Sequence, residues 1–308
     1  MLHGLPFSML KFPQFFGGQM GVPGSDTALG LRYAPQGLDY YVDGSHSDAR
    51  DTNDGTDPNE PFATIQAAIT ANNALIDWAA VPPYFGMNTI HIAPGEYAEA
   101  LTPPYYCRMI GGGQAMGGDV DVIVRPVAGS PMTGTGLGLY LENIRFDGMV
   151  ALPVLDFDTF NSCLIFNCMI SDGNPGLATV GIDIETAGGS SILGCNFAFS
   201  TNPMTIGIRS TGNFFDCEVT GNKIKAVTTG IDLSGAGLCG GSMAVHNMIW
   251  GGGQVLLGTG IDDSVVGDLL CVQNWITATD AISHADAAMT IDNHVMNAGV
   301  GAIETIAT

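Results

Sequence analysis

Charged residues are scarce in this sequence. They make up 13% of the 308 residues, about half the share that is usual in soluble proteins, and nine Lys and Arg stand against 30 Asp and Glu. The formal net charge of −21 repels phosphate backbones and anionic lipid surfaces, so no nucleic-acid or membrane-surface partner is expected. The shortage of charge also indicates that part of the outer surface is buried against copies of the chain or another protein, although uncharged Ser, Thr and Asn can cover some of it.

Long apolar runs are missing as well. No stretch of about 18 apolar residues occurs, which predicts no membrane span. The first residues, MLHGLPFSMLKFPQFFGGQMGVPG, have no basic start, no continuous apolar stretch and no small-residue cleavage site, so they are not typical of a signal peptide. They have no periodicity either, and we expect residues 1–36 to form an extended arm that is ordered only by docking on something.

The cysteines do not form a disulfide pattern. There are seven, an odd number, and none falls in a CxxC pair. Five lie inside apolar strand-like runs and are interpreted as small, reduced core residues: Cys163, Cys168, Cys195, Cys217 and Cys271. The sequence therefore predicts synthesis in a reducing cytoplasm.

Helical periodicity is confined to one segment. Residues 37–84 begin with a short strand and an acidic, turn-rich loop, followed by PFATIQAAITANNALIDWAA. Apolar residues recur near helical spacing in that segment, and Pro61 suits the start of a helix. From residue 137 onward no second helix is expected, because fragments of three to five strand-like residues alternate with Gly, Asn, Ser and Thr.

Two families of short segments repeat along the rest of the chain. CMISDG, CNFAF, NKIKA, NMIWG, NWITA and NHVMN begin 27, 27, 25, 27 and 19 residues apart, and GIDI, GIRS, GIDL and GIDD begin 26, 23 and 30 apart. A period of about 20–30 residues built from strands and turns is typical of a β-solenoid, in which each coil seals its neighbour's apolar face. The sequence therefore predicts an all-β fold, a right-handed parallel β-helix over residues 85–308.

Asparagine recurs at one place in the first of these families. In-register amides predict a ladder that bonds from coil to coil at one bend; the alternative is that Asn only marks turns. The four positions are Asn222, Asn247, Asn274 and Asn293.

Residues 40–102 resemble the start of pectate-lyase-like β-helix proteins. The resemblance rests on YYVDGS, on NDGTDPNEPFATIQAAI and on TIHIAPGEYAEAL. In that superfamily the first part is a strand and loop, the helix plugs the open end of the solenoid, and the third part is the first full coil. The resemblance implies a fold with an N-terminal capping helix but no single activity, since the superfamily holds lyases, hydrolases, epimerases, adhesins and viral tailspikes.

The catalytic signatures of two such enzyme families are incomplete here. Polygalacturonases carry Asn-Thr-Asp, Gly-Asp-Asp, Gly-His-Gly and Arg-Ile-Lys elements, of which this sequence offers only Gly-Ile-Asp-Asp at 260–263. Pectate lyases carry Trp-Ile-Asp-His, where this sequence has Trp-Ile-Thr-Ala at 275–278. No catalytic set is therefore predicted, and Asp232, Asp262 and Asp263 are kept as candidates.

The GID segments place charges at one outward position. Ile182 and Ile184 alternate inward, so Asp183 points out. Stacked coils lie about 4.8 Å apart, so this position forms a surface ladder that can hold a cation or a sugar or act as acid and base. The alternative is a solvated charged stripe whose members offset one another. The candidate ligand-binding residues are Asp183, Arg209, Asp232 and Asp262.

Two further features are candidate sites. Trp275 follows the ladder Asn274 and is expected to face outward, which makes it the best aromatic candidate for stacking on a sugar. In the acidic loop, Asp51, Asn53 and Asp57 can offer oxygens to Ca²⁺, although these residue types are also ordinary turn formers. No other cofactor is expected, and the six His share no metal-ligand spacing.

Together these features favour a non-enzymatic virion structural protein, either a capsid decoration or a spike or tail protein. The arm, residues 1–36, would anchor it to other virion proteins, and a homotrimer would bury one face of each solenoid around a three-fold axis. It would be made in the host cytoplasm, stand on the virion surface and be able to bind cell-surface polysaccharide. The alternatives are a tailspike-type polysaccharide lyase or glycoside hydrolase and a secreted bacterial adhesin, the latter disfavoured by the missing signal peptide and the unpaired Cys.

Overall fold

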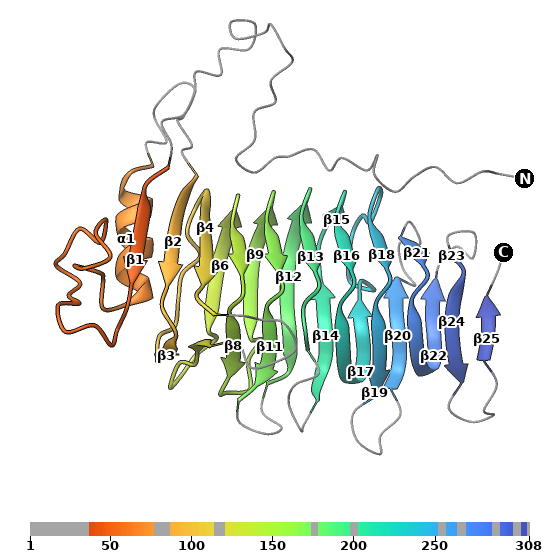
Figure 1. Ribbon diagram of the computed structural model, residues 1–308. Coiled ribbons are helices and arrows are strands. Elements are labelled where there is room, and N and C mark those ends of the chain that lie inside the picture. The colour runs from red at the N-terminus through yellow and green to blue at the C-terminus, as the bar shows by residue number, and fades with distance from the viewer. Residues whose placement is uncertain are drawn as a thin grey trace, which may run out of the picture.

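The computed structural model describes residues 37–76, 87–113, 121–173, 178–197, 203–251, 257–263, 269–284, 290–297 and 303–306. The predicted arm, residues 1–36, lies outside the described residues. The described chain winds as a parallel β-helix whose strands stack from the α1 end to the C-terminal end (Figure 1). The predicted all-β, right-handed parallel β-helix with one capping helix is confirmed.

Three sheets run along the solenoid, and we call them sheets 1, 2 and 3. Sheet 1 has ten strands and sheet 2 has four, all parallel to their neighbours. In order, sheet 1 contains β1 (Asp39–Val42), β2 (Asn88–Ile92), β4 (Cys107–Gly111), β7 (Tyr140–Glu142), β10 (Leu164–Phe166), β13 (Ser191–Leu193), β16 (Glu218–Thr220), β18 (Met243–Val245), β21 (Leu270–Val272) and β23 (Thr290–Ile291). Sheet 2 contains β3 (Gly95–Tyr97), β5 (Val122–Val124), β8 (Arg145–Gly148) and β11 (Met169–Asp172).

Sheet 3 is the longest and ends in the one antiparallel pair of the described strands, β24 with β25. Its main path contains β6 (Met132–Leu137), β9 (Leu155–Asn161), β12 (Val180–Gly188), β14 (Met204–Ser210), β17 (Lys223–Asp232), β19 (Met248–Gly251), β22 (Trp275–His284), β24 (Asn293–Asn297) and β25 (Ile303–Ile306). Beside this path, β15 (Phe214–Phe215) pairs with β12, and β20 (Leu257–Asp263) pairs with β17 and β22.

The helix α1 (Ile65–Ala74) covers the β1 end of the solenoid (Figure 1). It begins at Ile65 rather than at Pro61, where the sequence suggested its start. The reason is the cap: the Thr64 hydroxyl accepts a hydrogen bond from the Ala67 N–H at 3.3 Å, and the Glu99 carboxylate accepts from the first backbone N–H groups. The buried face of α1 shields the apolar end of the first coil from water.

The core is built from inward residues that align from coil to coil. Ile182 pairs in register with Ile208, Ile208 with Ile231, and Ile231 with Ile261, and all four are fully buried. The alternation of strand side chains places every second residue of each coil inside. The repeat predicted from the GID segments is therefore confirmed as a register.

The predicted asparagine ladder is also confirmed. The Nδ2 of Asn222 donates to Oδ1 of Asn247 at 3.0 Å, and Asn274 donates in the same way to Asn293 at 2.9 Å. All four side chains are fully buried. Cys195 occupies the equivalent place one coil earlier, where its N–H donates to Asn222 Oδ1 at 2.8 Å. All seven cysteines are buried and free, which includes the five that the sequence predicted as core residues.

The bend that precedes this ladder uses a left-handed backbone in every coil from β7 onward. The residue just after each sheet 1 strand has a positive φ, which lets the chain turn within one residue and start the next strand. Asn and Gly are common there because they adopt this conformation at little cost. These corner residues are Asn143, Asn167, Gly194, Gly221, His246, Gln273 and Asp292.

Candidate functional site

The structure brings four of the predicted site residues together on the outer face of sheet 3. Asp183 is in register with Arg209, Arg209 with Asp232, and Asp232 with Asp262. The structure therefore contains the predicted row of charged side chains, one from each successive strand. It also includes Asp156, which is in register with Asp183 and which sequence reasoning missed, because its segment, LDFD, lacks the Gly-Ile of the repeat.

Arg209 is bound closely to one neighbour. Its Nε and Nη2 donate to the two carboxylate oxygens of Asp183 at 2.8 and 2.5 Å. These hydrogen bonds, together with the charge of Asp183, raise the pKa of the Arg209 guanidinium. Such a bidentate pair fixes both side chains, so both oxygens of Asp183 are already engaged within the protein.

The other carboxylates of the ladder differ in their surroundings. Asp232 Oδ1 accepts hydrogen bonds from the Ser234 backbone N–H at 3.1 Å and from the Ser234 hydroxyl at 2.6 Å. Asp156 lies at the β9 end of the ladder, where partial burial, and then the charges of Asp183 and Asp158, raise its pKa. The ladder therefore carries more negative charge than the single guanidinium offsets.

Two predicted residues lie apart from this ladder. Asp263, a candidate catalytic residue, is fully buried, and its Oδ2 accepts from the Leu269 N–H at 3.3 Å, so it supports the turn into sheet 1 and is not placed to meet a substrate. Trp275 faces outward as predicted and is 42% exposed. It is the first residue of β22, however, whereas Ser283, the partner of Asp262, lies near the end of that strand. The Trp275 ring packs against the His294 ring, with the two ring centroids 5.5 Å apart.

The candidate calcium ligands take part in local turns. Asp51 Oδ1 accepts from the backbone N–H groups of Ala63 and Thr64 at 3.0 and 2.9 Å. The Asn53 amide donates to the Pro61 carbonyl at 2.9 Å, and Asp57 Oδ1 accepts from the Asn59 N–H at 2.8 Å. Within the described ranges, no group of three His, Cys, Asp or Glu side chains is placed to hold a metal ion. The hydrogen bonds favour the turn-forming role, and calcium binding stays a prediction.

Sequence reasoning missed a charged cluster in sheet 2. Asp147 is fully buried and accepts from Arg125 Nη2 at 2.6 Å and from Arg145 Nε at 2.7 Å, and the Ser171 hydroxyl also donates to it. Arg125 continues to Glu96 at 3.0 Å. Two arginines facing two carboxylates leave the cluster neutral, as a buried charge requires. Only the register of β5, β8 and β11 brings these distant residues together.

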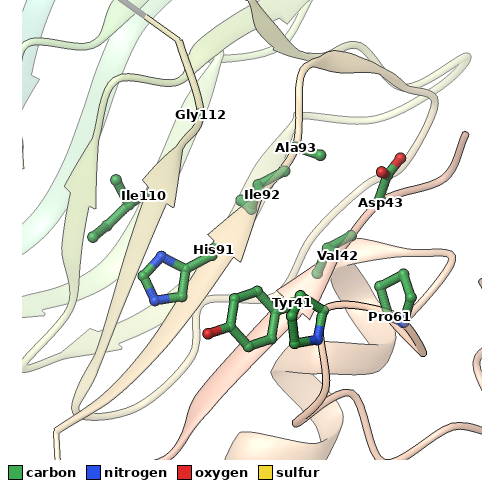
Figure 2. A pocket seen from close by; sticks show the side chains of 10 residues that line it. Tyr41, Val42, Asp43, Pro61, His91, Ile92, Ala93, Ile110 and Gly112 are labelled. Atoms are coloured by element: carbon green, nitrogen blue, oxygen red, sulfur yellow. The ribbon is translucent and has the colours of Figure 1, made fainter. Parts of the chain in front are cut away.

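A pocket of about 290 Å³ opens on the outer face of sheet 1, at its first strands (Figure 2). His91 and Tyr41 are in register and their rings stack at 5.2 Å with an interplanar angle of 18°. The pocket continues over Ile92 and Ala93 toward Pro61 (Figure 2). It thus combines aromatic and apolar walls with polar ring edges, the composition of a small-molecule site.

Charged and aromatic groups also stand on the outer face of the first sheet 1 strands, outside the lining of this pocket. His91 Nε2 lies 3.0 Å from Asp39 Oδ1. Arg108 sits 4.6 Å above the Tyr140 ring and donates to Glu142 at 2.5 Å. Burial, and then Glu142, raise the pKa of Tyr140 to about 12, so its hydroxyl stays a donor at neutral pH.

A search of the described residues for membrane-spanning helices finds none of sufficient length and hydropathy.

Comparison with known proteins gives no family for this chain, and the similar structures below all have TM-scores under 0.5. No family model matches the sequence, and no curated protein matches it. Escherichia coli YbhC is similar in structure, with 13% sequence identity, a TM-score of 0.49 and coverage of 84% of this chain and 76% of that chain. A pectin methylesterase in complex with a hexasaccharide has 10% identity and a TM-score of 0.39, with coverage of 85% of this chain and 90% of that chain. Pectin methylesterase from carrot has 13% identity and a TM-score of 0.35, with coverage of 83% of this chain and 88% of that chain. This likeness concerns the expected pectate-lyase-like β-helix fold and carries no argument about activity.

Proposed function

We propose that this chain is a non-enzymatic structural protein of a virion surface, a capsid decoration or a spike or tail component. It acts as a homotrimer that residues 1–36 anchor to other virion proteins. The observation that carries the non-enzymatic part is that protein contacts already occupy two of the candidate groups. The catalytic candidate Asp263 is enclosed in the core, and both oxygens of Asp183, a candidate ligand-binding residue, accept from Arg209.

The remaining carboxylates are placed side by side. Asp232 and Asp262 occupy neighbouring strands of one sheet face, so they approach any substrate from the same side. A two-carboxylate glycosidase needs its acid and its base on either side of the scissile bond. This arrangement supports a surface role better than a hydrolytic one.

The anchoring role has support in the connectivity. Residues 1–36 precede β1 in the sequence, and β1 is the first strand of sheet 1, at the end that α1 covers (Figure 1). An arm bound to a particle would therefore fix the solenoid at its capped end, and the remaining coils would project away from the particle. The scarcity of charge, at 13%, also fits a protein that is partly covered by others.

Particle incorporation tests this proposal. Deletion of residues 1–30 should abolish incorporation into particles, whereas Asp57→Asn, a change in an exposed turn, should leave it intact. Incorporation is measured by quantitative immunoblotting of purified particles. Normal incorporation of the deleted chain would contradict the anchoring role.

A tailspike-type lyase or glycoside hydrolase is the second candidate, because Asp232 and Asp262 are two neighbouring carboxylates on an outer face, even though both would approach a substrate from one side. The test is to incubate the protein with capsular and lipopolysaccharide glycans and to measure new reducing ends and unsaturated uronates. Activity that Asp232→Asn or Asp262→Asn abolishes would overturn the non-enzymatic proposal. No product from any glycan is the outcome that we expect.

Polysaccharide binding without cleavage belongs to the same proposal. The Tyr41–His91 pocket supports it, because flat aromatic and apolar walls can pack against the C–H faces of a sugar while the polar edges of the two rings offer hydrogen bonds. In a glycan-array measurement, Tyr41→Ala should weaken binding at least about tenfold, and Trp275→Ala should not. The reverse pattern would move the site to Trp275.

A further inference from the structure

The outer face of sheet 1 changes character along the solenoid. Apolar side chains occupy most of its outward positions from β10 onward, except at Ser191 and on β16, which carries Glu218 and Thr220; these apolar side chains are half-buried or exposed although they belong to regular strands. We call them the apolar strip, and its members are Leu164, Phe166, Leu193, Met243, Val245, Leu270, Val272 and Ile291.

The earlier strands of the same face are different. Outward positions on β1 to β7 include Asp39, His91, Arg108 and Glu142. Beyond β7, Glu218 is the one ionisable side chain among the outward positions that the structure describes on this sheet. The face therefore divides into a charged end and an uncharged end, although both have the same backbone geometry.

Further exposed apolar residues extend the apolar strip on both sides. Phe215 and Leu238 lie just before the sheet 1 strands of their coils and are 41% and 56% exposed. Met248 and Trp275 lie just after them, in register with each other, and are 46% and 42% exposed. Apolar residues dispersed singly on a surface need no explanation, but a group of them gathered on one face on both sides of β16 marks an interaction site.

The size of the patch fits a protein partner. Six strands about 4.8 Å apart give the strip a length of about 24 Å. Each three-residue strand spans about 10 Å, so the strip itself covers roughly 240 Å² of sheet 1, to which the margins around the two bends add. A patch of a few hundred Å² is of the size that marks an interaction site, and it supplies part of the roughly 800 Å² that each partner buries in a standard interface.

The charge of the chain indicates which partner this is. With a net charge of −21, two copies repel each other over most of their surfaces. The apolar strip is a large area where copies can approach with only Glu218 between them, and it offers nothing to a basic partner. We propose that copies of this chain associate through the apolar strip, sheet 1 against sheet 1, and bury it between them.

This inference rests on the proposed structural role, since it names the face that joins the copies. It is tested on the purified full chain without any particle. A failure of self-association would therefore leave the incorporation test of residues 1–36 untouched, and a failure of incorporation would leave the interface standing.

The experiment measures molar mass by light scattering after size exclusion over a range of protein concentrations. The native chain should show the mass of two or more copies. Leu193→Glu with Val245→Glu should raise the dissociation constant at least about 100-fold and give a monomer. The matched control is Thr89→Glu, an outward position of the same sheet outside the apolar strip, which should keep the native mass.

Circular dichroism and thermal melting show whether the double Glu variant still folds. If it does not, Val245→Thr with Val272→Thr replaces it, because Thr keeps the β-branched shape and adds only hydroxyls to the strip; this pair should weaken association at least about tenfold. A monomeric native chain, or a native mass in folded strip variants, would overturn the proposal. A native monomer that associates only after deletion of residues 1–30 would also overturn it, because the arm would then be the occupant.

Discussion

Asn247 donates its side-chain amide to the Oδ1 of Asn274, one coil further along, at 2.9 Å, and both side chains are fully buried. The same Oδ1 also accepts from the Asn247 backbone N–H at 3.0 Å. Asn222, Asn247 and Asn274 therefore each accept from polar groups of the preceding coil while their own amides donate to the Asn of the following one. A buried polar row of this kind is stable only when every member has its partners.

Removal of one member should therefore be costly. Asn247→Ala leaves the Asn222 amide and the Asn222 backbone N–H without their shared acceptor, and we expect a loss of about 2–3 kcal/mol in the free energy of unfolding. Urea denaturation followed by circular dichroism measures it. Asn59→Ala, in an exposed turn, is the control and should stay within about 0.5 kcal/mol of the native value. Equal stability of both variants would show that the row contributes nothing.

The corner residues predict which substitutions lower the stability of the fold most. Gly221 has a φ of +68°, and a Cβ there would meet no atom closer than 4.0 Å, so the cost is one of backbone conformation alone. Gly221→Ala should lower stability by about 1 kcal/mol, and Gly221→Asn should cost less, because Asn tolerates the left-handed region and already occupies it at Asn143 and Asn167. Melting temperatures of the two variants test this order. An Ala variant that melts above the Asn variant would contradict it.

Asp156, at the β9 end of the outer ladder, predicts a dependence of stability on pH. Partial burial and neighbouring carboxylates raise the pKa of Asp156 above its ordinary value of 3.8. The folded state then binds the proton more tightly than the unfolded state does, so this group lowers stability as pH rises from 3.8 through its folded pKa.

Asp156→Asn removes that penalty. At pH 7 the variant should be more stable than the native chain by up to about 1 kcal/mol, the scale of like charges on adjacent strands, and the gain should vanish as pH falls to about 3.8. Unfolding free energies from pH 3.5 to 7 measure the difference. Glu60→Gln, in the exposed loop, is the control and should show no comparable gain. A gain that persists at the lowest pH would rule out titration of Asp156 as its source.

The cysteines predict slow thiol chemistry. All seven are buried, and burial raises the pKa of the thiols of Cys163, Cys195 and Cys217 to about 12. A thiol reacts as its thiolate, so the native chain at pH 8 should react with a disulfide reagent at least about 100-fold more slowly than the denatured chain. Absorbance of the released thiolate measures the rate. Fast reaction of any native thiol would show that its coil opens.

The fold was within reach of the sequence because a solenoid repeats. Each coil meets only its neighbours, so the register that buries Ile182 also buries Ile208 and Ile231, and one period of roughly 25 residues predicts the architecture. The same reasoning placed Asp183, Arg209, Asp232 and Asp262 in one row. Asp263, kept as a catalytic candidate, follows the outward Asp262 and has a buried carboxylate, as the alternation of strand side chains accounts for.

What the sequence determined by itself is the winding of the chain: alternating strands, Asn at the bend and a capping helix are local patterns that need only the next coil. The tertiary structure alone decided which distant groups meet. Arg125 and Arg145 come together at Asp147, Tyr41 stacks on His91, and the apolar residues of β10 to β23 line up into one outer face. The physical reason is that coil lengths vary between the strands, so the partner of an outward side chain depends on the register that the whole stack adopts rather than on its own neighbours in the chain.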